Sequence, residues 1–254
     1  MIRSFILTRS LGKDPYSGII GYPHATPYQI RRRIAEFEGL GIGSVSFTGP
    51  TRVGKLNILG KGYVGVVVLA KRGTRKVALK IRRTDSQRSS MKLEAKMLKL
   101  ANSAKVGPKF YDASRNCLIM EYVNGQRISD WARSVNGRGS AARVKSVIKD
   151  VLEDCYRLDQ AGIDHGELSN ISKHVIIGES GHALIDFESS SVQRRASNVT
   201  SAAQAIFIGS GISKRIQRIY KIPAKTDIID SLRLYKRNGS RQNFDSLLNV
   251  LKLI

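Results

Sequence analysis

The chain has little of several features that would assign it to a particular class of protein. Two cysteines among 254 residues exclude a disulfide framework, and Cys117 and Cys155 each stand among apolar neighbours. No apolar run approaches the roughly 18 to 20 residues of a membrane-spanning helix. Arg9 follows the short apolar start too soon for a signal peptide. We therefore expect no membrane partner and a reducing compartment, the cytoplasm.

Acidic residues are also scarce. The chain has 20 Asp and Glu against 43 Lys and Arg, a formal net charge of +23, and the excess is strongest from Arg194 to the end. Such a charge attracts polyanions, so RNA or a ribonucleoprotein is an expected partner through the basic surface. A solvated surface of a halotolerant or thermophilic protein is the alternative, since no aromatic-rich RNA motif accompanies the charge.

The first half of the chain reads mainly as strands. A helix capped by Thr26 and Pro27 carries three arginines and ends near Gly39. A short strand over 44–48 follows. The next strands are expected at 56–59, 64–70 and 77–81, a helix at 86–101, and two further strands at 109–113 and 117–122.

The second half reads mainly as helices. A long helix is expected over 141–160, a hairpin over 175–177 and 183–187, and further helices from Asn198 onward. We therefore predict an α+β protein of two lobes with a cleft between them. Residues 1–50 are expected to form an N-terminal extension with one basic helix, 51–123 a β-rich lobe and 124–254 a helical lobe.

A glycine-rich stretch links two of the expected strands. Gly60, Gly62 and Gly65 lie between Leu59 and Val67. A dinucleotide fingerprint would need a helix directly after the glycines, and none is expected here. Glycines at a hairpin tip instead let backbone N–H groups approach triphosphate oxygens, which makes these five residues candidate nucleotide ligands. An ordinary glycine-containing hairpin remains the alternative.

Lys80 stands in the middle of an otherwise apolar strand. A buried ammonium costs several kcal/mol unless it is paired. Glu94, the one acid in the helix that follows, is the candidate partner, and such a pair would hold the amine where the α and β phosphates lie. The alternative is that Lys80 extends outward from an edge strand.

Two carboxylates of the second half suit the same chemistry. Asp186 ends an apolar hairpin, and hard oxygen ligands in that place suit Mg²⁺ bridging phosphates. Glu167 lies in the loop after the long helix, where it could accept a proton from a substrate hydroxyl or orient it. His165 is expected to brace that loop. The alternative is that both carboxylates are simple turn and cap residues.

Together these stretches resemble the protein-kinase-like superfamily over about residues 53–190. They match its Gly-rich loop, its strand lysine, its helix glutamate, its catalytic loop and its DFG motif. The strand over 118–123 resembles the kinase strand that leads to the hinge, where backbone groups of Glu121 and Val123 would bind adenine. His165-Gly166, in place of His-Arg, resembles the atypical branch of the superfamily. That branch contains the RIO kinases of ribosome maturation and the kinase subunit of the KEOPS complex. The HGEL and DFES motifs are similar to those of predicted archaeal serine/threonine kinases.

The chain also departs from the superfamily pattern. Glu167 replaces the catalytic Asp, and Ser172 replaces the metal-binding Asn, so Ser172 would hold metal through water, with Lys173 or His174 assisting with phosphate charge. Glu188 replaces a glycine and would restrict the backbone. No Ala-Pro-Glu segment follows, so the helical lobe is expected to lack a full activation segment.

The resemblance implies an ATP- and Mg²⁺-dependent atypical serine/threonine kinase that phosphorylates a partner or itself. Lys80 would anchor phosphates, Asp186 would hold metal, and Glu167 would position the acceptor hydroxyl. One alternative is an RNA- or ribosome-associated ATPase or nucleotide-gated scaffold with little protein kinase activity. A small-molecule kinase is a weaker alternative. Such enzymes usually need acidic pockets for cationic acceptors, and the basic second half of this chain offers few. The sequence gives neither the acceptor nor the oligomeric state.

Overall fold

The computed structural model describes residues 4–179, 181–209 and 211–254, and the chain divides into two compact units. Unit 1 comprises Met1–Leu98 and Lys109–Tyr122, and unit 2 comprises Lys99–Pro108 and Val123–Ile254. Strands dominate unit 1 and helices dominate unit 2. The predicted α+β class, with a β-rich first part and a helical second part, is confirmed.

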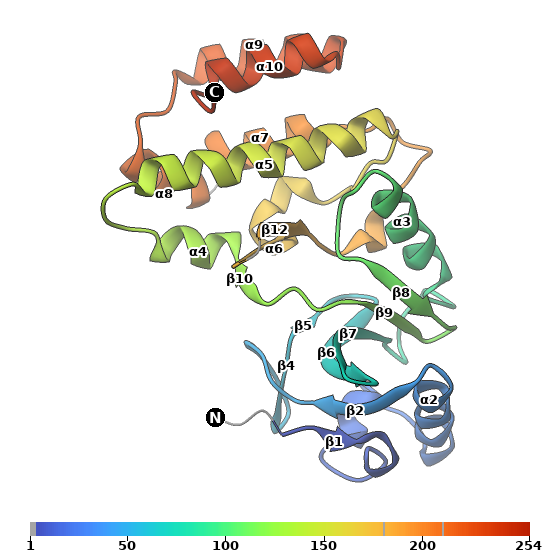
Figure 1. Ribbon diagram of the computed structural model, residues 1–254. Helices are drawn as coiled ribbons and strands as arrows, with labels where there is room; N and C mark the ends of the chain where they lie inside the picture. Colours follow the sequence, from blue (N-terminus) through green and yellow to red (C-terminus); the bar gives the residue numbers. More distant parts are fainter. Residues whose placement is uncertain (1–3, 180, 210) are drawn as a thin grey trace. The chain divides into compact units, whose positions relative to one another are not determined.

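Unit 1 is built on a seven-stranded antiparallel sheet in the order β1-β2-β6-β7-β9-β8, with β5 paired to β6 (Figure 1). Its strands are β1 (Ile6–Leu7), β2 (Ile42–Ser46), β5 (Gly60–Lys61), β6 (Gly65–Arg72), β7 (Arg75–Arg82), β8 (Phe110–Ala113) and β9 (Cys117–Glu121). A separate hairpin joins β3 (Thr51–Val53) to β4 (Leu56–Ile58). The remaining elements are η1 (Thr8–Ser10), α1 (Ser17–Ile20), α2 (Pro27–Gly39) and α3 (Lys92–Ser103), whose last residues belong to unit 2.

Alternation along β6 and β7 gives the sheet one apolar face. Val66 and Val68 of β6, and Leu79 and Ile81 of β7, are buried in one cluster with Phe37 of α2. Successive side chains of a strand point to opposite faces, so the residues between them lie on the other face of the sheet. The described part of the segment expected as an N-terminal extension thus supplies two strands and part of the core to unit 1.

The helix α2 begins and ends where the sequence predicts. The Thr26 hydroxyl accepts from the Gln29 N–H, and the Gln29 side chain accepts from the Thr26 N–H. This capping box satisfies two amide groups that the first helical turn leaves without partners. Pro27 occupies the first turn.

The helix α3 begins at Lys92, so the expected start near Ser86 is wrong. The preceding residues are held by non-helical contacts. The Arg82 guanidinium donates to the carbonyl oxygens of Arg83 and Arg88, and the Met91 N–H donates to the Arg115 carbonyl oxygen at 2.9 Å. Arg115 lies 24 positions from Met91 in the sequence, so local propensity does not reveal this contact.

Unit 2 is built around the long helix α5 (Ser140–Gln160), which Figure 1 shows alongside α7 (Asn198–Phe207). The buried residues of α5 recur every three or four positions and form one apolar stripe, at Val144, Ile148, Val151, Leu152, Cys155 and Leu158. The other helical elements are α4 (Ile128–Ser134), η2 (Leu168–Asn170), α6 (Ile171–His174), η3 (Phe187–Ser189), α8 (Gly211–Ile219), α9 (Lys225–Arg237) and α10 (Arg241–Val250). A three-stranded sheet has the order β10 (Gly125–Arg127), β11 (Val175–Gly178) and β12 (Gly181–Leu184).

Both cysteines are free thiols in apolar surroundings. Cys117 lies in the core of unit 1 and Cys155 in the stripe of α5. Burial raises the pKa of Cys117 to about 12, and it raises the pKa of Cys155 as well. Among the residues that the structure describes, every helix is too short or too polar to cross a bilayer.

Candidate functional site

The glycine-rich loop is a tight turn between β5 and β6. The Gly62 N–H donates to the Gly65 carbonyl oxygen at 2.8 Å, and the Leu59 N–H donates to the Val67 carbonyl oxygen at 2.9 Å. A Cβ atom on Gly65 would lie 2.8 Å from the Ile81 carbonyl oxygen. This position therefore requires glycine, because any side chain would push the loop away from β7.

Lys80 lies on β7, an interior strand paired with β6 and β9. Its Nζ is 2.8 Å from Oε1 of Glu94, and the two residues are 3% and 4% exposed. The alternative of an edge-strand lysine reaching into solvent is therefore wrong. The structure brings together the cation and the carboxylate that the sequence analysis paired, with Gly65 directly against the Lys80 side chain.

Glu121 and Val123, the expected adenine-binding residues, stand at the end of β9 and just after it. The Glu121 N–H donates to the Lys109 carbonyl oxygen at 2.8 Å, and the Lys109 N–H donates to the Glu121 carboxylate at 3.1 Å. The amide hydrogen of Glu121 is therefore already used, so an adenine contact at this residue would need its carbonyl oxygen.

In unit 2, Glu167 accepts hydrogen bonds at both carboxylate oxygens. His174 Nε2 lies 3.0 Å from Oε2, and the Ser189 hydroxyl donates to Oε1. The His174 side chain is 6% exposed and that of Glu167 is 34% exposed. The carboxylate is thus fixed from the protein side and remains accessible from solvent.

The backbone geometry explains why the expected catalytic loop has glycine at residue 166, where the kinase pattern has arginine. Its φ is +86°, and a Cβ atom there would lie 2.6 Å from an Arg194 guanidinium nitrogen and 2.7 Å from the Ser189 carbonyl oxygen. Arg194 is itself anchored, with Nε 2.7 Å from the Asp164 carboxylate. The loop can adopt this conformation only without a side chain at residue 166.

His165 braces the loop from inside. Its Nε2 lies 3.1 Å from the Ile185 carbonyl oxygen, and its backbone N–H donates to the Asn198 side chain at 2.9 Å. The residue is completely buried, and burial, with a smaller effect of His174, lowers the pKa of His165 to about 4. A neutral imidazole that donates from Nε2 to a carbonyl fits a structural role.

Asp186 lies in a different local structure from the one expected. The strand β12 ends at Leu184, so the expected strand up to Phe187 is too long. Asp186 has φ 72° and ψ 73°, and Phe187 begins the turn η3. The residue with the unusual backbone is therefore Asp186, whereas Glu188 has an ordinary φ and is buried.

Ser172 and its neighbours occupy the short helix α6. Ser172 is half-buried, and Lys173 is exposed. His174 is turned inward onto Glu167, and the expectation that Lys173 or His174 assists with phosphate charge stays a prediction. Within the described residues, no three His, Cys, Asp or Glu side chains form a group that could hold a metal. A Mg²⁺ ion at Asp186 would need phosphate oxygens as further ligands.

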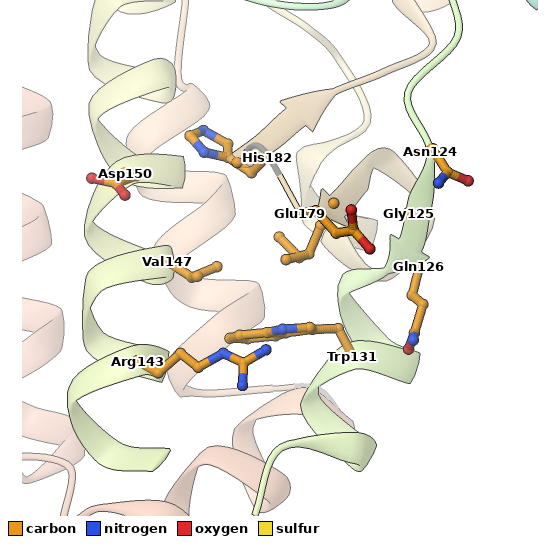
Figure 2. Close-up of a pocket in the computed structure, with 12 residues that line it drawn as sticks. Asn124, Gly125, Gln126, Trp131, Arg143, Val147, Asp150, Glu179 and His182 are labelled. Carbon is orange, nitrogen blue, oxygen red and sulfur yellow. The ribbon is translucent and has the colours of Figure 1, made fainter. Parts of the chain in front are cut away.

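A separate cavity of about 570 Å³ lies wholly in unit 2 (Figure 2). One wall is Trp131 of α4, a second is a face of α5, and a third is the hairpin of β11 and β12. None of the predicted site residues lines it. Its lining residues are Asn124, Gly125, Gln126, Trp131, Arg143, Val147, Asp150, Ile177, Gly178, Glu179, Gly181 and His182.

The sequence profile of the RIO domain matches residues 69–201, just over half of the chain. The chain belongs to the RIO-domain family. The matched range includes Lys80, Glu94, Glu167 and Asp186. Members of this family are atypical protein kinases and ATPases. At this general level, the RIO-domain assignment makes the chain a phosphotransferase.

The chain is also similar to a curated archaeal protein, the uncharacterized protein MJ1211 of Methanocaldococcus jannaschii. The two are 26% identical over 98 residues, which is 39% of this chain and 80% of the archaeal protein. This likeness adds a relative to the RIO-domain assignment without adding an activity.

Two residues that contact the site were not predicted from the sequence. From the segment after Asp186, Ser189 contacts Glu167 and Arg194 contacts Asp164. The serine is visible in the sequence as the fourth residue of the Asp-Phe-Glu-Ser motif. However, only the turn η3 that carries it brings its hydroxyl back onto Glu167.

Proposed function

We propose that this RIO-domain chain is an ATP- and Mg²⁺-dependent serine/threonine kinase that transfers the γ-phosphate of ATP to a hydroxyl of a partner or of itself. The observation that carries the proposal is the buried pair of Lys80 and Glu94 beside Gly65. An ammonium that is withdrawn from water, and held by a carboxylate next to a glycine-rich loop, is suited to triphosphate oxygens.

The residues present fit a nucleotide and its metal ion. Lys80 would contact the α and β phosphates, and Glu94 would keep its ammonium in place. The glycine-rich loop, from Leu59 to Val67, would present backbone N–H groups to the phosphates. Asp186 and Ser172 offer hard oxygen atoms, which Mg²⁺ prefers, and the bound ion would neutralise phosphate charge.

Glu167 is proposed to orient the acceptor hydroxyl. Its two oxygens accept hydrogen bonds from His174 and Ser189, and each carboxylate oxygen has a second lone pair. About a third of the side chain is exposed, which leaves access for a hydroxyl group. The acceptor proton would pass to this carboxylate as the hydroxyl attacks phosphorus and ADP leaves.

The test is phosphoryl transfer from γ-labelled ATP by the full chain and two variants. Asp186→Asn removes the proposed metal ligand while keeping nearly the same shape, and we expect labelling to be lost with the thermal unfolding midpoint unchanged. Asp150→Asn, which changes an exposed carboxylate of the cavity in Figure 2, is the matched control and should label normally. Labelling retained in Asp186→Asn would remove this residue from the mechanism.

A second candidate function is an RNA- or ribosome-associated ATPase with little protein kinase activity. The net charge of +23 and the replacements at Glu167 and Ser172 support it. The basic excess includes exposed cations of α8, at Lys214 and Arg218. It predicts ATP turnover without phosphoprotein and RNA binding that weakens steeply between 50 and 200 mM salt, by roughly a thousandfold for six phosphate contacts. RNA affinity that is indifferent to salt would exclude it.

A further inference from the structure

The N-terminal segment contacts the base of the glycine-rich loop through Tyr22. The aromatic ring of Tyr22 lies beside two cations, with Lys61 Nζ 5.5 Å and Arg83 Cζ 5.2 Å from the ring centroid. The Tyr22 hydroxyl also lies 3.4 Å from Lys61 Nζ. Lys61 is the last residue of β5, directly before the tip of the loop. The ring therefore contacts one cation on the loop and one on the strand end beside it.

Arg83 joins this aromatic ring to the tip of the loop. Its guanidinium donates to the Gly62 carbonyl oxygen at 3.2 Å, and its backbone N–H donates to the Val64 carbonyl oxygen at 2.8 Å. The guanidinium is further fixed by Asp85, at 2.6 and 2.8 Å. Two of the three tip residues are thus bonded to a single arginine. Tyr63, the third, is 90% exposed.

The ring itself is held on a rigid base. The Tyr22 carbonyl oxygen accepts from the N–H and hydroxyl of Thr84, at 2.9 and 3.2 Å. Ile19 and Ile20, just before it, are buried in the core of unit 1. The segment that carries Tyr22 is therefore anchored independently of the loop.

Glycine residues contribute little to fixing a loop's conformation, because glycine has little rotational restriction and no side chain to contact a neighbour. Backbone N–H groups bind phosphate best when their positions are set before the ligand arrives. We propose that Tyr22 is a positioning residue for the glycine-rich loop, and that it acts through Lys61 and Arg83. The role of the N-terminal segment is then to preorganise the loop for polyphosphate, an inference that rests on the proposed function.

The experiment compares the full-length chain with three variants. Tyr22→Phe keeps the aromatic ring, and Tyr22→Leu keeps an apolar side chain but removes the ring. Tyr28→Leu is the matched control, because Tyr28 of α2 is 60% exposed and pairs with Arg32, 5.9 Å from its ring centroid. The readouts are the Kd of a non-hydrolysable ATP analogue with Mg²⁺, the thermal unfolding midpoint, and hydrogen exchange at the Gly62 and Arg83 amides.

We expect Tyr22→Leu to weaken nucleotide binding by about three- to tenfold, the size of one partly exposed cation–π contact. Exchange at the Gly62 and Arg83 amides should accelerate in that variant by a similar factor. Tyr22→Phe and Tyr28→Leu should bind within about twofold of the unchanged chain. Recovery by phenylalanine and not by leucine separates the ring's contact with the two cations from simple packing.

Unchanged binding and unchanged exchange in Tyr22→Leu would overturn the inference. Faster exchange throughout the sheet, with a lower unfolding midpoint, would also overturn it, because Tyr22 would then be a packing residue. If the unchanged chain binds no nucleotide, the proposed function fails. The exchange of Gly62 still reports whether Tyr22 holds the loop, so the two failures are distinguishable.

Discussion

Lys80 Nζ lies 2.8 Å from Glu94 Oε1, and both residues are almost completely buried. In the sheet, Lys80 of β7 lies opposite Val67 of β6 on one side and opposite Leu118 of β9 on the other. Neither charge can reach bulk water without moving the centre of the sheet or the start of α3. Unit 1 therefore maintains an internal ion pair, which is weak evidence for stability and supports the proposed contact of Lys80 with phosphate.

The first prediction concerns this ion pair. Lys80→Met removes the ammonium that neutralises the buried Glu94 carboxylate, so we expect the free energy of unfolding to fall by about 3 to 5 kcal/mol. The double change Lys80→Met with Glu94→Leu should restore most of this loss, because no charge then remains. Urea unfolding of the single and double variants measures both effects.

The control for the ion pair is the exposed pair of Arg233 and Asp230, whose side chains are each 69% exposed. Arg233→Met should change the free energy of unfolding by less than about 1 kcal/mol. If Lys80→Met were as stable as the unchanged chain, Lys80 would have to reach water, contrary to the structure.

The second prediction concerns the hold of His174 on Glu167. His174→Leu removes the donor at Oε2 and leaves Ser189 as the donor at Oε1. A hydrogen bond to a charged group contributes about 1.5 to 3 kcal/mol, so kcat for ATP turnover should fall by roughly ten- to a hundredfold. Since His174 is not among the proposed nucleotide ligands, the KM for ATP should change little. A change in KM with kcat preserved would place His174 at the nucleotide.

The third prediction concerns Gly166. Alanine there meets both a left-handed backbone and two atoms closer than 3 Å, so we expect a loss of about 2 to 4 kcal/mol in the free energy of unfolding. Gly162 has a similar φ of +67° with no neighbouring atom within 4 Å of the added Cβ. Gly162→Ala should therefore cost only about 1 kcal/mol. Equal losses in the two variants would show that the contacts with Arg194 and Ser189 do not matter.

The elements that the sequence predicted correctly depend on neighbours in the chain. The start of α2 is set by Thr26, Pro27 and Gln29, all within one turn. The pair of Lys80 and Glu94 could be predicted because a cation in an apolar strand requires a partner, and only one acid stood in the next helix. Family membership followed from the order of several such local motifs.

The remaining features depend on contacts that close only in the folded chain. The Ser189 hydroxyl reaches Glu167 across 22 positions of sequence, and Asp186 adopts its left-handed backbone between β12 and η3. Arg83 connects Tyr22 to the glycine-rich loop, although 61 positions separate Tyr22 from Arg83. Neither hydrophobic periodicity nor turn composition carries information about such pairs.

The last prediction concerns the stability of the fold in weak acid. The pKa of His165 is lowered to about 4 in the folded chain, chiefly by burial, while an unfolded histidine titrates near 6.5. The unfolded chain therefore binds a proton first as the pH falls below 6.5. The stability contributed by neutral His165 is complete above that pH and is lost between pH 6.5 and 4, a loss of about 3 kcal/mol.

Urea unfolding at pH 7 and at pH 4.5 measures this loss in the unchanged chain and in His165→Gln. Glutamine at this position cannot be protonated, so the difference in unfolding free energy between the two pH values should shrink by about 2 to 3 kcal/mol. His24→Gln is the control, because it removes a histidine that is exposed. An equally steep loss in His165→Gln would mean that other groups, such as carboxylates paired in the folded state, produce the acid sensitivity. The buried imidazole of His165 would then have no part in it.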